Sequence, residues 1–273
     1  MKKGTGSTLF FILVLVVGLS LLLYPSFSDY WNSMHQSKAI ATYSEQVAHL
    51  DKEDYSHIWE DAIGFNRDLR SRENVFAMSE EEYAEYLRQL NPSGNGIMGY
   101  IEIPAINCSL PVYHSVEETI LQIAVGHVEW TSLPTGGAGT HCVLSGHRGL
   151  PSAKLFTHLD RLREKDLFML RILDELLTYE VDQILIVEPH EVDALLIEEG
   201  KDLCTLVTCT PYGVNSHRLL VRGHRVENTP ETVELRVTSD AVQVEPLLIA
   251  PILAAMLLLI LLLFLLLRPS RKR

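Results

Sequence analysis

The sequence predicts a mainly β fold with flanking helices and a transmembrane helix at each end. From Ile97 onward, apolar residues recur with a period of two in short segments, which is typical of strands. Between Asp29 and about Leu90 they recur every three or four residues, which is typical of helices. Two long apolar runs without charged residues lie near the two ends of the chain.

The first apolar run extends from Ser7 to Tyr24 and follows Lys2 and Lys3. It is just long enough to cross a bilayer, which takes about 20 residues. It begins like a signal peptide, but no small-residue cleavage motif follows it, so we predict an uncleaved anchor.

The second apolar run extends from Leu247 to Leu267 and ends in the basic segment Arg268–Arg273. Because both runs carry their basic residues on the outer side, the positive-inside rule predicts that both termini are cytoplasmic and that residues 29–245 are extracellular. The chain is therefore expected at the cell membrane.

Charge and cysteine content limit the function further. The formal net charge is −12 although both tails are basic, so the extracellular part is strongly acidic and should repel nucleic acid. Its four cysteines make two disulfides the default expectation outside a cell. Cys204 and Cys209 cannot pair with each other, because five positions of regular strand place them about 16 Å apart on opposite faces.

The helical region ends before the strands begin. Ser79 and Glu82 form a capping-box pattern that predicts a short helix ending at Asn91-Pro92, and Ser93–Gly96 marks a boundary. A further helix is predicted from Ser152 to Leu162. The predicted strands are Met98–Ile103, Ser109–Tyr113, Thr140–Leu144, Leu167–Ile172, Thr178–Val187, Leu203–Cys209 and Arg218–Gly223, and their number suggests a barrel or a sandwich.

The chain thus divides into successive parts along its length. They are an N-terminal tail and anchor (1–28), a helical region (29–95), a β domain (96–228), a linker without periodicity (229–245), a C-terminal membrane helix (246–267) and a basic tail (268–273).

Three residue types at strand ends point to nucleophilic catalysis. Cys209 ends a strand before a Pro-Gly turn, and His147 lies between two glycines after another strand. The strand after the turn brings Arg218 or Arg222 beside the thiol, and side-chain parity does not choose between them. A lone cysteine is more often a buried hydrophobe or half of a disulfide, but a thiol, an imidazole and a guanidinium together suit acyl transfer.

A zinc site is the rival chemical interpretation. Cys204, Cys209, His217 and His224 contain the right atoms, but their spacing matches no compact zinc motif. We therefore expect no metal and no cofactor.

Specific motifs make the chain resemble the class C, pilus-assembling sortases. They are TLVTC at 205–209, SGHRGLPSAKLF at 145–156 and the arginine nine residues after the cysteine. The resemblance covers about Gly96 to Arg225 and implies a closed eight-stranded barrel. It also implies Cys209 as the nucleophile, His147 as the acid/base partner and Arg218 as the oxyanion donor.

The resemblance further implies a two-step transpeptidation on pilin subunits. The thiolate cleaves a Leu-Pro-x-Thr-Gly-like sorting signal after Thr, and a pilin lysine amine resolves the thioester. The alternatives are a sortase that attaches proteins to cell-wall precursor, a protease, and a non-catalytic tethered module with Cys209 bonded to Cys108 or Cys142. The sequence leaves the oligomeric state undetermined.

One family feature is absent from this sequence. Many class C sortases cover the site with a lid that carries an Asp-Pro-aromatic motif, and residues 70–95 contain no such triplet. The nearest substitute is Arg72–Phe76, in which Phe76 would cap the thiol and Glu73 would pair with an arginine. A plain turn between helices is an equal alternative.

Overall fold

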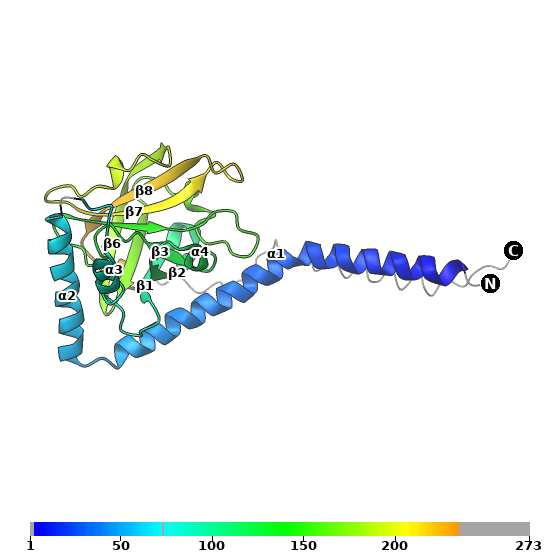
Figure 1. Ribbon diagram of the computed structural model, residues 1–273, viewed down its shortest axis with the longest axis horizontal. Coiled ribbons are helices and arrows are strands. Elements are labelled where there is room, and N and C mark those ends of the chain that lie inside the picture. The colour runs from blue at the N-terminus through cyan, green and yellow to red at the C-terminus, as the bar shows by residue number, and fades with distance from the viewer. Residues whose placement is uncertain (1–2, 73, 235–273) are drawn as a thin grey trace.

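A computed structural model describes residues 3–72 and 74–234. A long helix, α1 (Lys3–Ala48), leads into a domain that contains α2 (Lys52–Arg70), α3 (Glu80–Tyr86) and a β-barrel (Figure 1). The predicted C-terminal membrane helix, the basic tail, most of the predicted linker and Glu73 lie outside the described residues.

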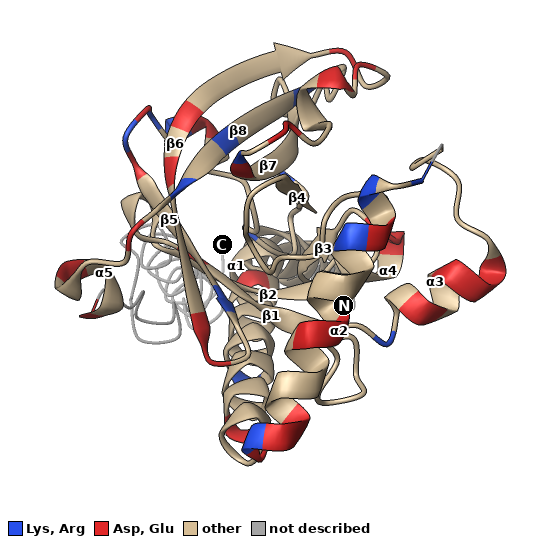
Figure 2. Cartoon of the chain, turned by 90° about the vertical axis from the view of Figure 1, so that its left-hand side faces the viewer, with Lys and Arg blue, Asp and Glu red and all other residues tan. Residues whose placement is uncertain are grey.

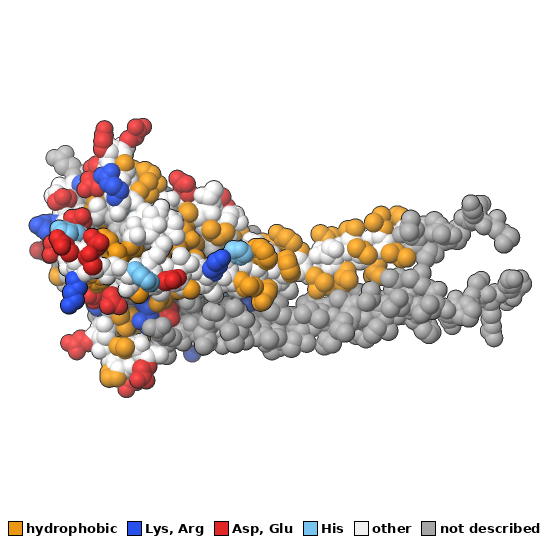
Figure 3. Space-filling view, turned by 90° about the horizontal axis from the view of Figure 1, so that it is seen from below, with side chains coloured by type: hydrophobic (Ala, Val, Ile, Leu, Met, Phe, Trp, Pro, Cys, Tyr) orange, Lys and Arg blue, Asp and Glu red, His pale blue; other side chains and the backbone are white. Residues whose placement is uncertain are grey.

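Helix α1 joins the predicted anchor to the helical region without a break. Pro25 lies inside it, and its segment from Phe10 onward is long and apolar enough to cross a membrane. Figure 3 shows hydrophobic side chains along the part of α1 that extends beyond the domain. At the other end of the helix, Tyr43 is buried against the barrel.

Local signals explain where the next two helices begin. The Asp51 side chain accepts hydrogen bonds from the N–H groups of Glu53 and Asp54 at the start of α2. Ser79 and Glu82 form the predicted capping box at the start of α3. Helix α3 ends at Tyr86, earlier than predicted, and turns connect it to β1. Figure 2 marks positions of Asp and Glu in red along α2 and α3, in keeping with the negative charge.

Eight strands close into the barrel that the resemblance implies. Their order around it is β1-β2-β3-β4-β7-β8-β6-β5, with β2/β3 and β4/β7 parallel and the other pairs antiparallel. The strands are β1 (Ile97–Ile103), β2 (Cys108–His114), β3 (Val125–His127), β4 (Thr140–Ser145), β5 (Leu167–Ile172), β6 (Glu175–Val187), β7 (Asp202–Thr210) and β8 (His217–Val226). Sequence periodicity missed only β3 among them.

The predicted helix from Ser152 to Leu162 is wrong. Only the short 3-10 helix η2 (Leu159–Arg161) forms there. Leu155 has a φ of +40°, and the Phe156 N–H bonds to the His147 carbonyl instead of a helical partner. The segment still buries its apolar side chains, so its spacing reflects packing rather than a regular helix.

The remaining short elements lie in connections around the barrel. They are η1 (Pro104–Ile106), α4 (Glu118–Leu121), η3 (Asp193–Leu195) and α5 (Pro230–Glu234). Helix α5 corrects the prediction of an irregular linker at its start, where Thr229 and Thr232 hydrogen-bond each other.

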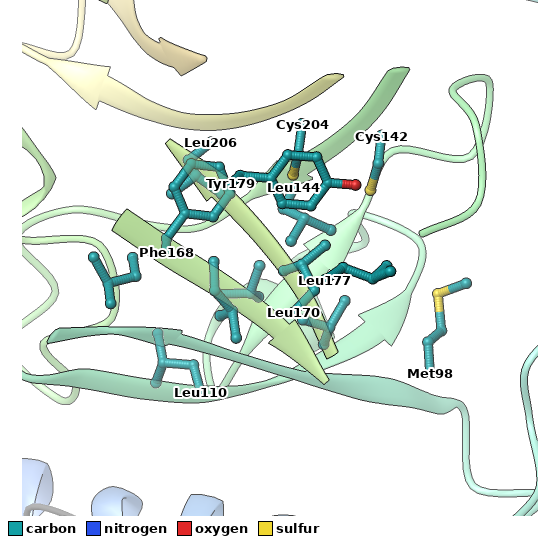
Figure 4. Close-up of a cluster of buried hydrophobic side chains, with 14 of the residues drawn as sticks. Met98, Leu110, Cys142, Leu144, Phe168, Leu170, Leu177, Tyr179, Cys204 and Leu206 are labelled. Atoms are coloured by element: carbon teal, nitrogen blue, oxygen red, sulfur yellow. The ribbon is translucent and has the colours of Figure 1, made fainter. Parts of the chain in front are cut away.

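The barrel interior is filled by alternating side chains from opposite strands. Phe168 and Tyr179 stack with ring centroids 5.5 Å apart, and Leu144 and Leu206 lie beside them (Figure 4). On β7, Cys204 and Leu206 face the interior. Because side chains alternate along a strand, Cys209 faces the other side of the barrel wall.

Candidate active site

Cys209 lies near the end of β7, directly opposite Arg218 on β8. The two residues are paired in the antiparallel ladder. Cys209 is partly exposed, whereas the other three cysteines are buried. All four are free thiols, which corrects the expectation of disulfides and contradicts a bond from Cys209 to Cys108 or Cys142.

His147 follows the end of β4, the strand on the other side of β7. The parallel register pairs Ser145 with Val207, and the Gly146 N–H then donates to the Val207 carbonyl at 3.0 Å. The Thr208 hydroxyl donates to the Gly146 carbonyl at 2.8 Å. Continued by two residues, this register places His147 level with Cys209. The structure therefore brings the three predicted residues to one end of the barrel, with Cys209 between the other two.

Close packing explains the two glycines near His147, Gly146 and Gly149. A Cβ on Gly146 would lie 2.8 Å from the Phe156 ring, and one on Gly149 would lie 2.8 Å from the Tyr212 ring. Gly149 also has a φ of +77°, which disfavours other residues. These contacts fix the backbone on both sides of His147.

The imidazole of His147 faces a carboxylate that no sequence motif marks as part of the site. Its Nε2 lies 3.3 Å from Glu118 Oε2 on α4. Hydrogen bonds from Gln122 and then from His147 hold the pKa of Glu118 below its usual range, so this carboxylate is ionised at neutral pH. Glu118 belongs to a four-residue helix with no recognisable motif, which is why sequence reasoning missed it.

The structure shows different surroundings for Arg218 and Arg222, which the alternation of side chains along the strand could not distinguish. Arg218 is beside Cys209, and its guanidinium donates to the backbone carbonyls of Asn215 and His217 at 3.3 and 3.2 Å. Arg222 is paired with Thr205, farther along the sheet, and contacts Asp182 at 3.0 Å and Glu198 at 2.9 Å. Arg218 is therefore the arginine that lies next to the thiol. Its two hydrogen bonds above go to carbonyl groups, whereas those of Arg222 go to carboxylates.

An apolar strip runs along the barrel wall from Cys209. Val207 and Leu220 precede the Cys209–Arg218 pair on the same face, and they belong to a buried cluster against which Trp130 packs. The buried members of this cluster are Val128, Val143, Leu195, Val207 and Leu220. All five side chains are at most 9% exposed, so the cluster stabilises the barrel wall beside the thiol.

The turn at Arg72–Phe76, the nearest substitute for a lid, contacts Trp130, which packs against this cluster. Phe76 packs edge-to-face on Trp130 with ring centroids 5.0 Å apart, and its N–H bonds to the Asn74 side chain. Next to it, Val75, Trp130 and Leu195 line a cavity of about 480 Å³. The contact given for Phe76 is thus with Trp130, and a cap on the thiol stays a prediction.

The residues of the rival zinc interpretation are not assembled into a site. Cys204 points into the barrel interior (Figure 4), whereas Cys209 faces the other side of the wall. Burial raises the pKa of Cys204 well above its usual range, so this thiol stays protonated. Within residues 3–72 and 74–234, no group of three His, Cys, Asp or Glu residues is placed to hold a metal ion.

Comparison with known proteins gives consistent matches. A sortase domain family model matches residues 101–226. The chain is similar to the crystal structure of sortase C1 from Streptococcus agalactiae, with 49% identity, 70% of this chain and 100% of that chain covered, and a TM-score of 0.69. It is also similar to sortase C of Streptococcus pneumoniae, with 44% identity, 70% and 97% coverage, and a TM-score of 0.62. Among curated proteins, sortase A of Bacillus anthracis is 25% identical over 180 residues, which cover 60% of this chain and 84% of that protein.

Proposed function

The chain belongs to the sortase family and, within it, to class C, so it is a cysteine transpeptidase, and from that premise we propose that it polymerises pilin subunits at the outer face of a cell membrane. What supports this proposal is the pairing of Cys209 with Arg218 on β8, with β4, the strand that leads into His147, on the other side of β7. The sortase C structure of S. pneumoniae is described as informative about pilin substrate specificity, which supports the same substrate class here.

In the first step, Cys209 Sγ attacks the carbonyl carbon of the Thr-Gly bond in the sorting signal. Arg218 stabilises the negative charge that develops on the carbonyl oxygen. His147 donates a proton to the departing glycine amine, the C–N bond breaks, and a thioester joins the pilin to Cys209.

In the second step, the ε-amine of a pilin lysine attacks the thioester. His147 accepts the proton that the amine loses, the C–S bond breaks, and an isopeptide bond forms as Cys209 is released. The thioester retains enough free energy for this exchange without ATP. Water must be kept from the thioester, because hydrolysis would release the pilin unjoined.

Helix α1 supports anchoring in the membrane, and the sequence adds a second anchor at the C-terminus, with both termini cytoplasmic.

Replacement of the nucleophile tests the proposal. Cys209→Ala should abolish high-molecular-weight pilin ladders in cells, whereas Cys204→Ala, on the same strand but buried, should retain them. Incubation with a sorting-signal peptide should give an acyl adduct on Cys209, visible by mass spectrometry. Ladders that persist in Cys209→Ala cells would contradict the proposal. Pilin that reaches the wall only as monomers in wild-type cells would favour attachment to cell-wall precursor.

A further inference from the structure

Helix α1 directly contacts the loop that carries His147. We call residues 147–158, between β4 and η2, the His147 loop. The Asp29 carboxylate accepts a hydrogen bond from the Lys154 N–H at 3.0 Å and forms an ion pair with Lys154 Nζ at 3.4 Å. One turn farther along α1, the Asn32 side chain donates to the Ser152 carbonyl at 2.8 Å. The membrane helix and the His147 loop are therefore held together at Asp29 and Asn32.

The position of Asp29 along α1 sets the height of this contact. Asp29 is the first charged residue after Lys3, and α1 is one continuous helix through both. The hydrocarbon core is about 30 Å thick and takes about 20 residues of helix. Lys3 and Asp29 are about 39 Å apart along the helix, so with Lys3 at the inner edge of the core Asp29 lies about 9 Å beyond the outer edge, at the level of the lipid headgroups.

Aromatic side chains on the same stretch of α1 indicate the same level. Tyr24, Tyr30 and Trp31 are 56%, 47% and 55% exposed, and Phe27 between them is also exposed. Tyr and Trp concentrate at membrane–water interfaces, where the ring is in an apolar layer and the polar atom reaches water. These residues span about 10 Å of helix, which is comparable to the thickness of one interfacial layer.

A second part of the site lies at the same end of the domain. The turn between β7 and β8 and the His147 loop both lie on the side from which α1 extends toward its N-terminus (Figure 1). The turn exposes 60% of Tyr212 and 69% of Val214. The Arg148 guanidinium lies 5.8 Å from the centroid of the Tyr212 ring, so the turn and the His147 loop form one surface.

We propose that the His147 loop and the β7–β8 turn rest on the headgroup layer of the outer leaflet, so that Cys209, which comes just before this turn, lies near the lipid surface. The proposal rests on the membrane anchoring by α1 proposed above. Exposed apolar side chains at the tip of the turn gain by entering the interfacial layer, and Asp29 and Lys154 satisfy each other's charge there. A peptide bond that reaches Cys209 must then lie within a few residues of the point where its chain leaves the membrane.

Depth-dependent quenching tests this contact with the full chain. In a Cys209→Ala background, a fluorophore is attached to Pro151→Cys in the His147 loop, and the buried Cys108, Cys142 and Cys204 are shielded from the label. The matched control carries the label at Glu199→Cys, in the exposed loop before β7. Both proteins are reconstituted in phosphatidylcholine vesicles that contain a lipid with a nitroxide on its headgroup.

We expect several-fold stronger quenching at position 151 than at position 199, in vesicles without any other protein. Equal quenching at the two positions would overturn the headgroup contact. A carbonate wash and flotation of the same vesicles separate the two proposals. If the wash removes the protein from the vesicles, the membrane anchoring by α1 is contradicted. If the protein stays but the two labels are quenched equally, only the headgroup contact of the His147 loop is contradicted. Quenching at position 151 that requires added pilin would assign the surface to pilin and also overturn the lipid contact.

Discussion

Arg218 and Arg222 project from the same face of β8, but their surroundings give them different roles. Arg218→Ala should lower kcat/KM for peptide cleavage by about 100-fold or more, because it removes the oxyanion donor that we propose. Arg222→Ala should lower the free energy of unfolding by about 1–3 kcal/mol, because it removes the guanidinium that pairs with both Asp182 and Glu198. Cleavage kinetics and urea unfolding of both variants check this, and the opposite assignment of effects would contradict it.

Accessibility distinguishes Cys209 from the other thiols. Iodoacetamide should modify the native, unreduced protein once, at Cys209, because Cys108, Cys142 and Cys204 are buried. Intact-mass measurement followed by peptide mapping locates the adduct. Cys209→Ala should take up no label under the same conditions. Absence of labelling in the wild-type protein would show that the thiol is blocked.

Buried His114 should make stability depend on pH. Burial lowers the pKa of His114 to about 4, although carbonyls of Gly96 and Gln89 contact its two ring nitrogens. An unfolded histidine has a pKa of about 6.5, so the unfolded chain binds more protons between these two values and stability falls as the pH drops. This group alone should cost about 2 kcal/mol of unfolding free energy between pH 7 and pH 5.

Comparison of variants isolates this contribution from that of the carboxylates. His114→Gln should flatten the dependence of the unfolding free energy on pH by that amount, as measured by urea unfolding. His190→Gln removes an exposed histidine and should leave the dependence as in the wild type. An unchanged slope in His114→Gln would contradict the prediction.

The buried hydroxyl of Tyr43 helps to attach helix α1 to the barrel. Tyr43 donates to the Met98 carbonyl at 2.9 Å and accepts from the Leu173 N–H at 2.7 Å. Tyr43→Phe should lower the free energy of unfolding by about 1–3 kcal/mol, because both backbone groups lose a buried partner. Tyr30→Phe, whose hydroxyl is on the exposed part of α1, should change it little. Equal stability of the two variants would contradict this role of Tyr43.

The strength of local patterns explains how much of the fold the sequence could predict. The capping box at Ser79 and the long alternating strands are local signals, and the structure has them. The three-residue strand β3 is too short to show a period, and the segment from Ser152 to Leu162 has helical spacing although its N–H groups bond elsewhere. Glu118 and the contact of Asp29 with Lys154 depend on residues distant in sequence, so no window of the chain could show them.

The height of the domain above the membrane should matter only for substrates that are themselves anchored. A seven-residue helical insert between Ser28 and Asp29 lifts the domain by about 10 Å and turns it by nearly two full turns, so its orientation is almost kept. The contacts of Asp29 and Asn32 with the His147 loop move with the domain. We call the protein with this insert the lifted variant. If Cys209 acts at the lipid surface, the lifted variant should still cleave a soluble sorting-signal peptide at the wild-type rate.

The lifted variant should lose most of its activity on membrane-borne pilin, because the Thr-Gly bond of the sorting signal no longer reaches Cys209. Vesicles that contain the enzyme and full-length pilin measure this activity as the rate of ladder formation on a denaturing gel. The control carries the same seven residues between His49 and Leu50, after the end of α1. This insert adds the same length to the chain but leaves the distance between Asp29 and the membrane unchanged. Wild-type rates on both substrates in the lifted variant would show that the distance from the lipid does not limit the reaction.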